Sequence, residues 1–266
     1  MKQRLDITLV QQGLAPSREQ AQSLIKNGQV SLDGKTLTKP SFAVEPDAAL
    51  RITGETLPFV SRGGLKLQRA LERFPLELEG KVCADIGAST GGFTDCMLQH
   101  GAKYVYAIDV GTGQLHPSLL SDPRVCNMEN TNIRSLTAAS LPEQPDFCSV
   151  DVSFISLSYV LPVMEEILAP DAQAVVLVKP QFEAGKGNVG KKGVVKDPKI
   201  HLQVLRSVAR YAVENGFGVL QADYSPIKGP EGNIEYLYLL QKGGQSVPDD
   251  AVLRELTAAA HQALDR

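Results

Sequence analysis

The chain has 266 residues, and its 27 lysines and arginines against 30 aspartates and glutamates give a formal net charge of −3. Hydrophobic residues make up 43% of the sequence and charged residues 21%, which is typical of a soluble protein with a sizeable core. This balance excludes a strongly basic protein and gives no sign of a nucleic-acid partner. The sequence shows no secretory signal and no apolar run of membrane-helix length, so we expect a cytoplasmic protein.

The four cysteines, Cys83, Cys96, Cys126 and Cys148, lie in or beside apolar runs. None belongs to a C-x-x-C pair, the spacing that is typical of zinc sites and redox motifs. We therefore expect buried thiols in a reducing compartment and no metal site.

Residues 1–58 predict a small α+β domain that is separate from the rest of the chain. After a short first helix, Ser17 with Gln20 three residues later forms the capping box of a second helix. Asp33-Gly34 predicts a hairpin between two short strands. Pro58 directly precedes the stretch 59–64, and the glycine pair Gly63-Gly64 ends it. These residues argue against one continuous element, so we expect the stretch to be a linker.

Strand-like and helix-like runs alternate over residues 65–244. This order predicts an α/β fold of the Rossmann-like type, with a mostly parallel seven-stranded sheet and helices on both faces. An amphipathic pattern over 245–266 predicts a C-terminal helix. The expected strands lie near 81–86, 104–109, 124–127, 146–151, 173–179, 217–223 and 234–240, and the expected helices near 92–100, 156–168 and 199–214.

The segment from Asp85 to Phe93, DIGASTGGF, follows the first expected strand of this sheet and leads into a helix. Such loops receive nucleotide-like ligands, because glycines allow close approach and the helix N-terminus offers free N–H groups. Neither a Gly-Lys-Ser/Thr phosphate loop nor the G-x-G-x-x-G spacing is present. A cofactor with a ribose, an adenine and no phosphates fits better, and S-adenosyl-L-methionine is the common one. The alternative is a tight turn without a ligand.

Three further polar residues, Asp109, Asp151 and Lys179, follow expected strands. In a doubly wound sheet, ligands bind beyond the carboxyl ends of the strands, which share one edge. Asp109, about twenty residues after the glycine loop, suits a grip on a ribose diol. As alternatives, each aspartate would cap a helix and Lys179 would be a solvated lysine.

Longer motifs carry a specific resemblance. The loop resembles the cofactor loop of the FtsJ-like RNA ribose methyltransferases, and four other motifs resemble the TlyA branch of that group. The N-terminal module resembles the small RNA-binding fold shared by a small-subunit ribosomal protein and many RNA-modifying enzymes. The TlyA-like motifs are SRGGLKL (61–67), DVSFISL (151–157), VKPQFE (178–183) and GNIEY (232–236), and those of the RNA-binding fold are RLD (4–6) and SREQA (17–21).

The resemblance implies a Lys-Asp-Lys-Glu catalytic tetrad at Lys66, Asp151, Lys179 and Glu235. Lys179 would be the base for a ribose 2′-hydroxyl, and Lys66 the neighbouring cation that orients it. The two carboxylates would hold the lysines and place the ribose. Without the resemblance, a solvated lysine is an equally good interpretation of Lys66. Glu235 would then be a position on the polar face of an alternating strand.

The resemblance also implies how the cofactor is held. Asp109 would hold its ribose, and Asn130 or Asn132 would approach its adenine, with turn chemistry as the alternative for these asparagines. The residues expected at its methionine end are Asp85, Gly87, Ala88, Ser89, Thr90, Gly91, Gly92 and Phe93.

Two groups of basic residues are candidates for RNA contacts. Arg4, Arg18 and Lys26 would share a face of the N-terminal module, although a mixed solvated surface is the alternative. The Gly- and Lys-rich stretch 181–199 follows Lys179, and we expect it to be a mobile basic lid over RNA. Its lysines are Lys186, Lys191, Lys192, Lys196 and Lys199.

Together these features predict S-adenosylmethionine-dependent 2′-O-ribose methylation of ribosomal RNA, with ribosomal RNA or ribosomal subunits as partners and no membrane. Three alternatives remain open: a haemolysin-type toxin, an RNA-binding protein with an inactive methyltransferase domain, and a base methyltransferase. The last is disfavoured because Asp151-Val152-Ser153-Phe154 stands where the Asn-Pro-Pro-Tyr type cage of base methyltransferases is expected.

Overall fold

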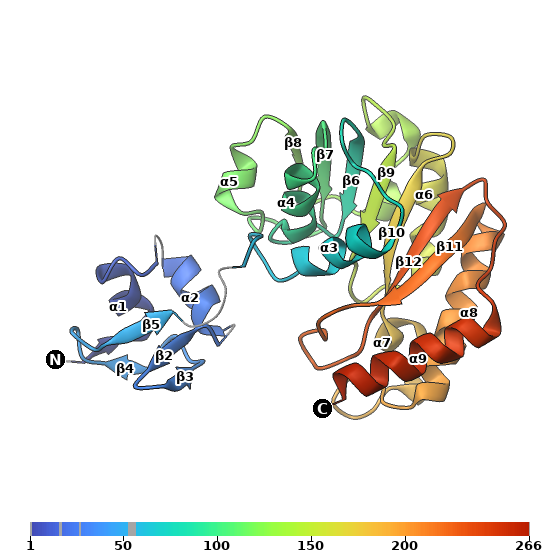
Figure 1. Ribbon diagram of the computed structural model, residues 1–266. Coiled ribbons are helices and arrows are strands. Elements are labelled where there is room, and N and C mark those ends of the chain that lie inside the picture. Colours follow the sequence, from blue (N-terminus) through green and yellow to red (C-terminus); the bar gives the residue numbers. More distant parts are fainter. Residues whose placement is uncertain (1, 16–17, 27, 53–56, 266) are drawn as a thin grey trace. The chain divides into compact units, whose positions relative to one another are not determined.

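The structure is a computed structural model that describes residues 2–15, 18–26, 28–52 and 57–265, without the side chains of Glu19, Ser23 and Lys26. The capping serine Ser17 and the side chain of Lys26 therefore lie outside the described residues. Contacts along the chain divide it into two compact units, Met1–Leu57 and Pro58–Arg266. Each unit is described by itself (Figure 1).

The first unit packs two helices, α1 (Leu5–Gln11) and α2 (Arg18–Lys26), on short antiparallel strands. The predicted hairpin is present, with both Asp33 and Gly34 at positive φ between its strands. A small apolar core that includes Leu5, Leu9 and Ile25 holds the unit together. Strands β2 (Val30–Leu32), β3 (Lys35–Leu37) and β5 (Leu50–Ile52) form one sheet, and β1 (Gln3–Arg4) pairs with β4 (Ala43–Val44).

The second unit contains the predicted seven-stranded sheet, which confirms the fold class. Its strand order is β11-β12-β10-β9-β6-β7-β8, and every neighbouring pair is parallel except the two that involve β12. Apolar residues on both faces of the central strands explain their burial between helices. The strands are β6 (Val82–Ile86), β7 (Tyr104–Ile108), β8 (Val125–Met128), β9 (Phe147–Val150), β10 (Gln173–Val178), β11 (Phe217–Tyr224) and β12 (Tyr236–Lys242).

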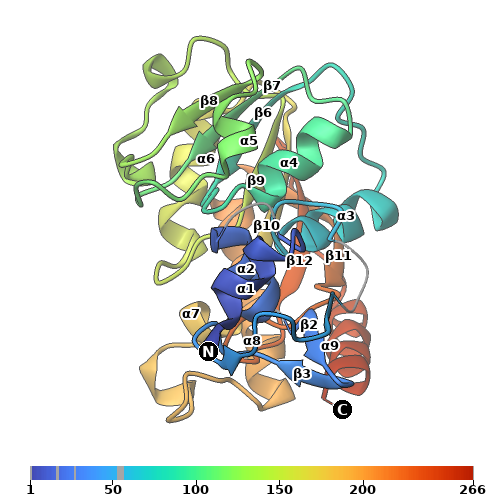
Figure 2. The ribbon, with the colours of Figure 1, turned by 90° about the vertical axis from the view of Figure 1, so that its left-hand side faces the viewer.

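Two layers of helices cover this sheet, and each belongs to its own apolar cluster. Figure 2 shows α3 and α4 on one side of the strands and α6 on the other. The first layer consists of α3 (Gly64–Arg73), α4 (Gly92–Gln99) and α5 (Pro117–Leu120), and the second of α6 (Leu161–Ile167), α8 (Pro198–Glu214) and α9 (Asp250–Leu264). The helix expected at 156–168 is interrupted: a 3₁₀ turn at Leu157–Tyr159 precedes α6, which has a proline in its first turn.

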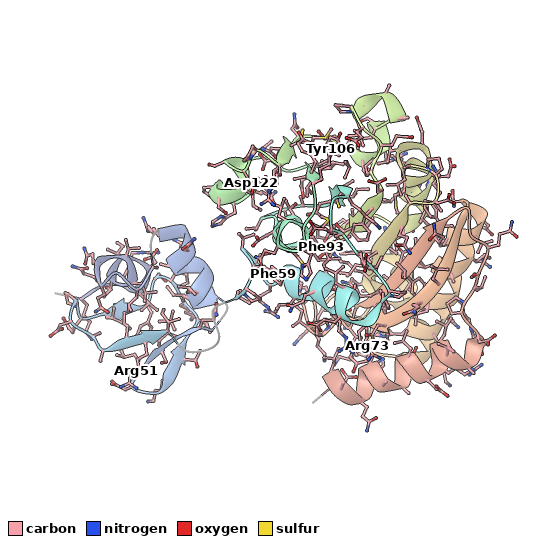
Figure 3. All side chains as sticks on the ribbon, turned by 45° about the horizontal axis from the view of Figure 1, so that its top comes forward. Arg51, Phe59, Arg73, Phe93, Tyr106 and Asp122 are labelled. Carbon is pink, nitrogen blue, oxygen red and sulfur yellow. The ribbon has the colours of Figure 1, made fainter. Side chains whose placement is uncertain are left out.

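The stretch 59–64, expected to be a linker, is packed into the second unit. Phe59 is buried, and the N–H of Val60 donates to Asp95 of α4. A Cβ atom on Gly64 would lie 2.4 Å from the Phe59 ring, so only glycine allows this packing. Figure 3 labels Phe59 together with Phe93, the second residue of α4. The stretch therefore fixes the start of α3 against α4.

The described part of the chain contains no helix that is both long and apolar enough to cross a bilayer. Cys83, Cys96 and Cys148 are buried free thiols, and Cys126 is half-buried and free. No group of His, Cys, Asp or Glu side chains suited to a metal ion occurs within the ranges that the structure describes.

Candidate functional site

The four side chains of the predicted tetrad meet at the carboxyl edge of the sheet. Lys66 Nζ donates to Glu235 Oε2 at 2.7 Å and to Asp151 Oδ2 at 3.2 Å. The other oxygen of Asp151 forms an ion pair with Lys179. The result is a chain of alternating charges, Glu235–Lys66–Asp151–Lys179, drawn from a helix and three strand ends.

Burial and charge act in opposite directions within this chain. Burial lowers the pKa of Lys66, but Asp151 and Glu235 together outweigh it and raise that pKa above its usual value. Burial likewise raises the pKa of Asp151, but the two lysines outweigh it and hold the pKa below its ordinary value. Lys66 is therefore a fixed cation, and Asp151 is an ionised carboxylate that contacts the side-chain nitrogens of both lysines.

Glycines bring the backbone close to two of the tetrad residues. A Cβ atom on Gly87 would lie 2.5 Å from the carbonyl oxygen of Asp151, and one on Gly229 would lie 2.5 Å from Glu235 Oε1. A larger residue at either position would push the strand end or the carboxylate away. Gly229 was not predicted from the sequence, because its partner is six residues away across a turn.

Lys66 lies on α3, the first helix of the second unit. A Cβ atom on Gly92 would lie 2.3 Å from Ser61 Oγ and 2.8 Å from the N atom of Gly64. The segment that precedes α3 is therefore seated directly on the glycine loop at the start of α4. Lys66, in the first turn of α3, reaches the tetrad with only 7% of its surface exposed.

The glycine loop adopts a backbone that its residues make possible. Gly87, Ser89 and Gly91 all have positive φ. Asp85, which precedes the loop, is fully buried and accepts hydrogen bonds from the N–H and hydroxyl of Thr94 and from the hydroxyl of Ser149. Oδ2 of Asp85 thus holds the start of α4 and Oδ1 bonds to β9, so both oxygens are engaged within the protein and position the loop.

The other predicted cofactor residues surround the ends of β7 and β8. Asp109 Oδ2 accepts from the N–H of Ser89 at 2.8 Å, and Oδ1 accepts from the N–H of Gly111 at 2.7 Å, so this carboxylate shapes the loop. Asn130 has positive φ, and Asn132 caps a 3₁₀ turn by accepting from the N–H of Arg134. The turn chemistry considered for the asparagines is therefore present.

Glu129 is an acid at this edge that the sequence analysis did not single out. It accepts from the N–H of Gln114 at 2.6 Å and from the N–H of Leu115 at 3.2 Å. These bonds, with one from the side chain of Asn127, lower the pKa of Glu129 to about 2. The carboxylate fixes the loop after β7 against the end of β8. The feature of the sequence that could have identified Glu129 is its position directly before Asn130.

The lysine-rich segment after Lys179 is exposed but tied down at both ends. At its start, Glu183 accepts from the hydroxyl of Ser156 and from the N–H of Leu157, at 2.7 Å each. At its far end, Asn233 accepts from the N–H of Val195 and donates to the carbonyl of Gly193. The three lysines singled out in this segment as RNA contacts, Lys186, Lys191 and Lys192, are all exposed.

Phe154 was missed as a candidate, and it is the most exposed large hydrophobic residue of the described chain, at 91%. It has positive φ, a strained conformation for an aromatic residue. Its ring lies 5.1 Å from that of Phe182, and the ammonium group of Lys179 lies 5.9 Å from the Phe182 ring. An apolar, open surface therefore borders the tetrad.

In the first unit, the structure brings Arg4 and Arg18 together on one buried carboxylate. Asp6 accepts from Nε and Nη2 of Arg4, from Nε of Arg18 and from the side chain of Gln22, at 2.8–3.0 Å. The carboxylate is fully buried, whereas the arginine side chains are 43% and 56% exposed. The two guanidinium groups are held side by side at the surface.

Comparison with protein families assigns both units. The FtsJ-like methyltransferase profile matches residues 59–242, which include the glycine loop and all four tetrad residues. The chain belongs to the FtsJ-like methyltransferase family. The S4 domain profile matches residues 3–50, within the first unit of this FtsJ-like methyltransferase.

Relatives of this FtsJ-like methyltransferase share both units. The 16S/23S rRNA (cytidine-2'-O)-methyltransferase TlyA of Mycobacterium tuberculosis is 47% identical over 90% of this chain and 89% of that protein. Hemolysin A of Brachyspira hyodysenteriae is 39% identical over 88% of this chain and 98% of that protein. A solved structure from Streptococcus thermophilus that carries a hemolysin name has a TM-score of 0.81 at 46% identity, covering 99% of this chain and 97% of that one.

Proposed function

We propose that this protein transfers a methyl group from S-adenosylmethionine to a ribose 2′-hydroxyl of ribosomal RNA in the cytoplasm. The observation that carries this proposal is the buried chain Glu235–Lys66–Asp151–Lys179 beside a glycine loop. The name of the Mycobacterium tuberculosis relative supports ribosomal RNA as the substrate and a cytidine as the target.

The loop residues fit S-adenosylmethionine. Thr94 and Asp85 fix the start of α4, where the N–H groups of Gly92 and Phe93 have no acceptor among the described residues. Those donors suit the carboxylate of the methionine end, and Asp109 suits the ribose diol. No basic side chain occurs between 85 and 93, which agrees with a ligand that has no phosphates.

The tetrad supplies the chemistry on the acceptor side. S-adenosylmethionine, when bound, would supply the methyl group from its sulfonium, and the sulfur would keep the electron pair of the broken S–C bond. The acceptor oxygen would gain that methyl group and lose its proton. Lys66, a cation held by two carboxylates, orients the hydroxyl. Lys179 in its neutral form would accept the proton, and Asp151, which contacts both lysines, would keep the two side chains together. Phe154 offers a surface on which the base of the target nucleotide can stack.

A direct test measures transfer of labelled methyl groups to purified ribosomal RNA and to ribosomal subunits. The Lys179→Ala variant should lose about 10²–10⁴-fold in rate. Lys103→Ala, which removes an exposed lysine paired with Glu143, is the matched control and should keep full activity. Nucleoside analysis of the product should find 2′-O-methylcytidine. A methylated base would refute the reaction class, and a fully active Lys179→Ala would refute the role of the tetrad.

A further inference from the structure

Asp223, near the end of β11, is a second buried carboxylate that holds two arginines. Its oxygen Oδ2 lies 2.9 Å from Nε of Arg69 and 3.4 Å from Nε of Arg73. The guanidinium carbon of Arg69 also lies 5.7 Å from the centre of the Tyr224 ring. Arg69 is thus fixed both by a carboxylate and by an aromatic face.

This cluster lies beside the tetrad. Arg69 follows Lys66 by three residues on α3, so the two side chains are neighbours on one side of the helix. On the sheet, Tyr224 is paired with Tyr236, and the N–H of Ser225 donates to the carbonyl of Glu235 at 2.9 Å. The cluster therefore flanks the tetrad on the Glu235 side, whereas the lysine-rich segment 181–199 begins on the Lys179 side.

The arginines keep donors that can face solvent. Both ion pairs use Nε, and no partner among the described residues takes the terminal N–H groups of Arg69 or Arg73. Arg73, which Figure 3 labels, has 60% of its side chain exposed. The Asp223 carboxylate, whose side chain is only 9% exposed, holds the two guanidinium groups in a fixed orientation, and the three side chains together carry a net charge of +1.

We propose that Arg69 and Arg73 bind a phosphodiester group of the acceptor RNA next to the reacting nucleotide. The planar guanidinium group suits bidentate contact with phosphate oxygens, and Asp223 and Tyr224 orient it in advance. The proposal rests on the proposed function, because it takes RNA as the substrate. The acceptor strand then crosses the tetrad from the lysine-rich segment to this arginine pair.

The test compares Arg69→Gln and Arg73→Gln with Arg210→Gln in the full-length protein. Arg210 is a matched control, because it also pairs with a carboxylate, Glu214, and lies 5.6 Å from a tyrosine ring, but it stands near the C-terminal end of α8, toward the opposite edge of the sheet. Equilibrium binding to purified 23S rRNA is measured without cofactor at several salt concentrations, and methylation kinetics are measured separately. Cofactor affinity serves as the check on folding.

Each substitution of Arg69 or Arg73 should weaken RNA binding about tenfold and lower the slope of log affinity against log salt by about one. The cofactor affinity of these variants should equal that of the wild type, and Arg210→Gln should match the wild type in RNA affinity and salt slope. Arg73→Lys keeps the charge but loses the planar guanidinium group, so its RNA affinity should lie between those of the wild type and Arg73→Gln. An Arg73→Gln variant that binds RNA as tightly as the wild type would overturn the proposal. The proposal would also be overturned if both glutamine variants lost cofactor binding together with RNA binding, because the loss would then reflect folding. Failure of the wild type to methylate ribose, with these binding differences intact, would instead refute the proposed function.

Discussion

At the scale of single residues, the two lysines of the tetrad occupy different electrostatic positions. Lys66 contacts two carboxylates, the buried Glu235 and the half-buried Asp151, whereas Asp151 still contacts Lys66 when Lys179 is removed. Lys66→Met should therefore lower the free energy of unfolding by about 3–5 kcal/mol, because Glu235 would then be a buried carboxylate without the cation that it pairs with. Lys179→Met should lower it by much less and still abolish catalysis.

Urea unfolding at neutral pH, combined with methylation assays, measures both effects. Lys103→Met is the control, since its exposed ion pair with Glu143 should contribute under about 1 kcal/mol. Equal destabilisation by the Lys66 and Lys179 substitutions would contradict this division between the two lysines.

Asp85 makes the stability of the second unit depend on pH. Burial raises its pKa to about 6, although hydrogen bonds from Thr94 and Ser149 oppose the shift. The pKa in an unfolded chain is about 3.9, so the folded state binds this proton more strongly. The stability that the proton contributes is present below about pH 4 and is lost as the pH rises through about 6, a change of about 3 kcal/mol.

This contribution can be isolated with Asp85→Asn, which cannot titrate. Between pH 4 and pH 7, the wild type should lose about 3 kcal/mol of unfolding free energy relative to the variant. Urea unfolding at the two pH values measures the difference. A constant difference between the two proteins across this range would show that Asp85 does not carry the effect.

Phe154 is an exposed aromatic residue in a strained backbone conformation, and its ring lies against that of Phe182. If it stacks on the target base, Phe154→Ala should raise KM for ribosomal RNA about tenfold or more, since one stacked base contributes about 1–3 kcal/mol. Stability should stay within about 0.5 kcal/mol of the wild type. Leu220→Ala, at another exposed apolar position, is the control for KM. An unchanged KM in Phe154→Ala would remove the stacking role.

At the scale of secondary-structure elements, Asp6 connects the first two helices of the first unit. Removing its charge makes an RNA-binding unit more positive, and by charge alone this should strengthen RNA binding. We expect the opposite for Asp6→Asn, because Arg4 and Arg18 lose the carboxylate that orients them. Affinity for ribosomal RNA should fall about tenfold, whereas Asp47→Asn, the same change at an exposed acid, should leave it equal or higher.

RNA-binding titrations of the two variants measure this difference in sign. In a background that already lacks both arginines, Asp6→Asn should have no further effect, which separates a positioning role from a general loss of folding. Stronger binding by Asp6→Asn than by the wild type would show that Asp6 acts only through its charge.

At the scale of the whole molecule, local patterns predicted more of the fold than of the site. The central strands of the sheet are mostly apolar runs, and the loop glycines follow one another in a recognisable order, so both could be predicted from neighbouring residues. Contacts between distant residues could not be read in this way. Asp6 with Arg18, Asp223 with Arg69 and Gly229 with Glu235 all depend on how elements pack.

The predicted roles of Asp85 and Asp109 show the same limit. Sequence order placed both aspartates at the glycine loop, where the structure also has them. It did not distinguish a carboxylate that touches a ligand from one that shapes the loop around it. That distinction depends on burial and on hydrogen-bond partners, which a pattern of residue types does not specify.

The charge of the whole chain leads to the last prediction. Its net charge of −3 opposes binding to RNA, so affinity must come from local groups such as Lys186, Lys191 and Lys192, which form no ion pair among the described residues. Such contacts release counterions, so RNA affinity should fall steeply with salt, by about 10³-fold between 50 and 200 mM for about six phosphate contacts. Cofactor affinity should barely change, since the proposed site holds the cofactor without basic side chains.

Neutralising the three lysines to glutamine should lower the salt slope of RNA binding by about two to three. A triple control at the opposite edge of the sheet, Lys81→Gln, Lys103→Gln and Arg210→Gln, changes the net charge equally but removes no proposed RNA contact. Fluorescence titration with ribosomal RNA at several salt concentrations compares the two variants. Equal slopes would mean that RNA responds to the total charge of the protein, and the lysine-rich segment would then have no specific role in binding it.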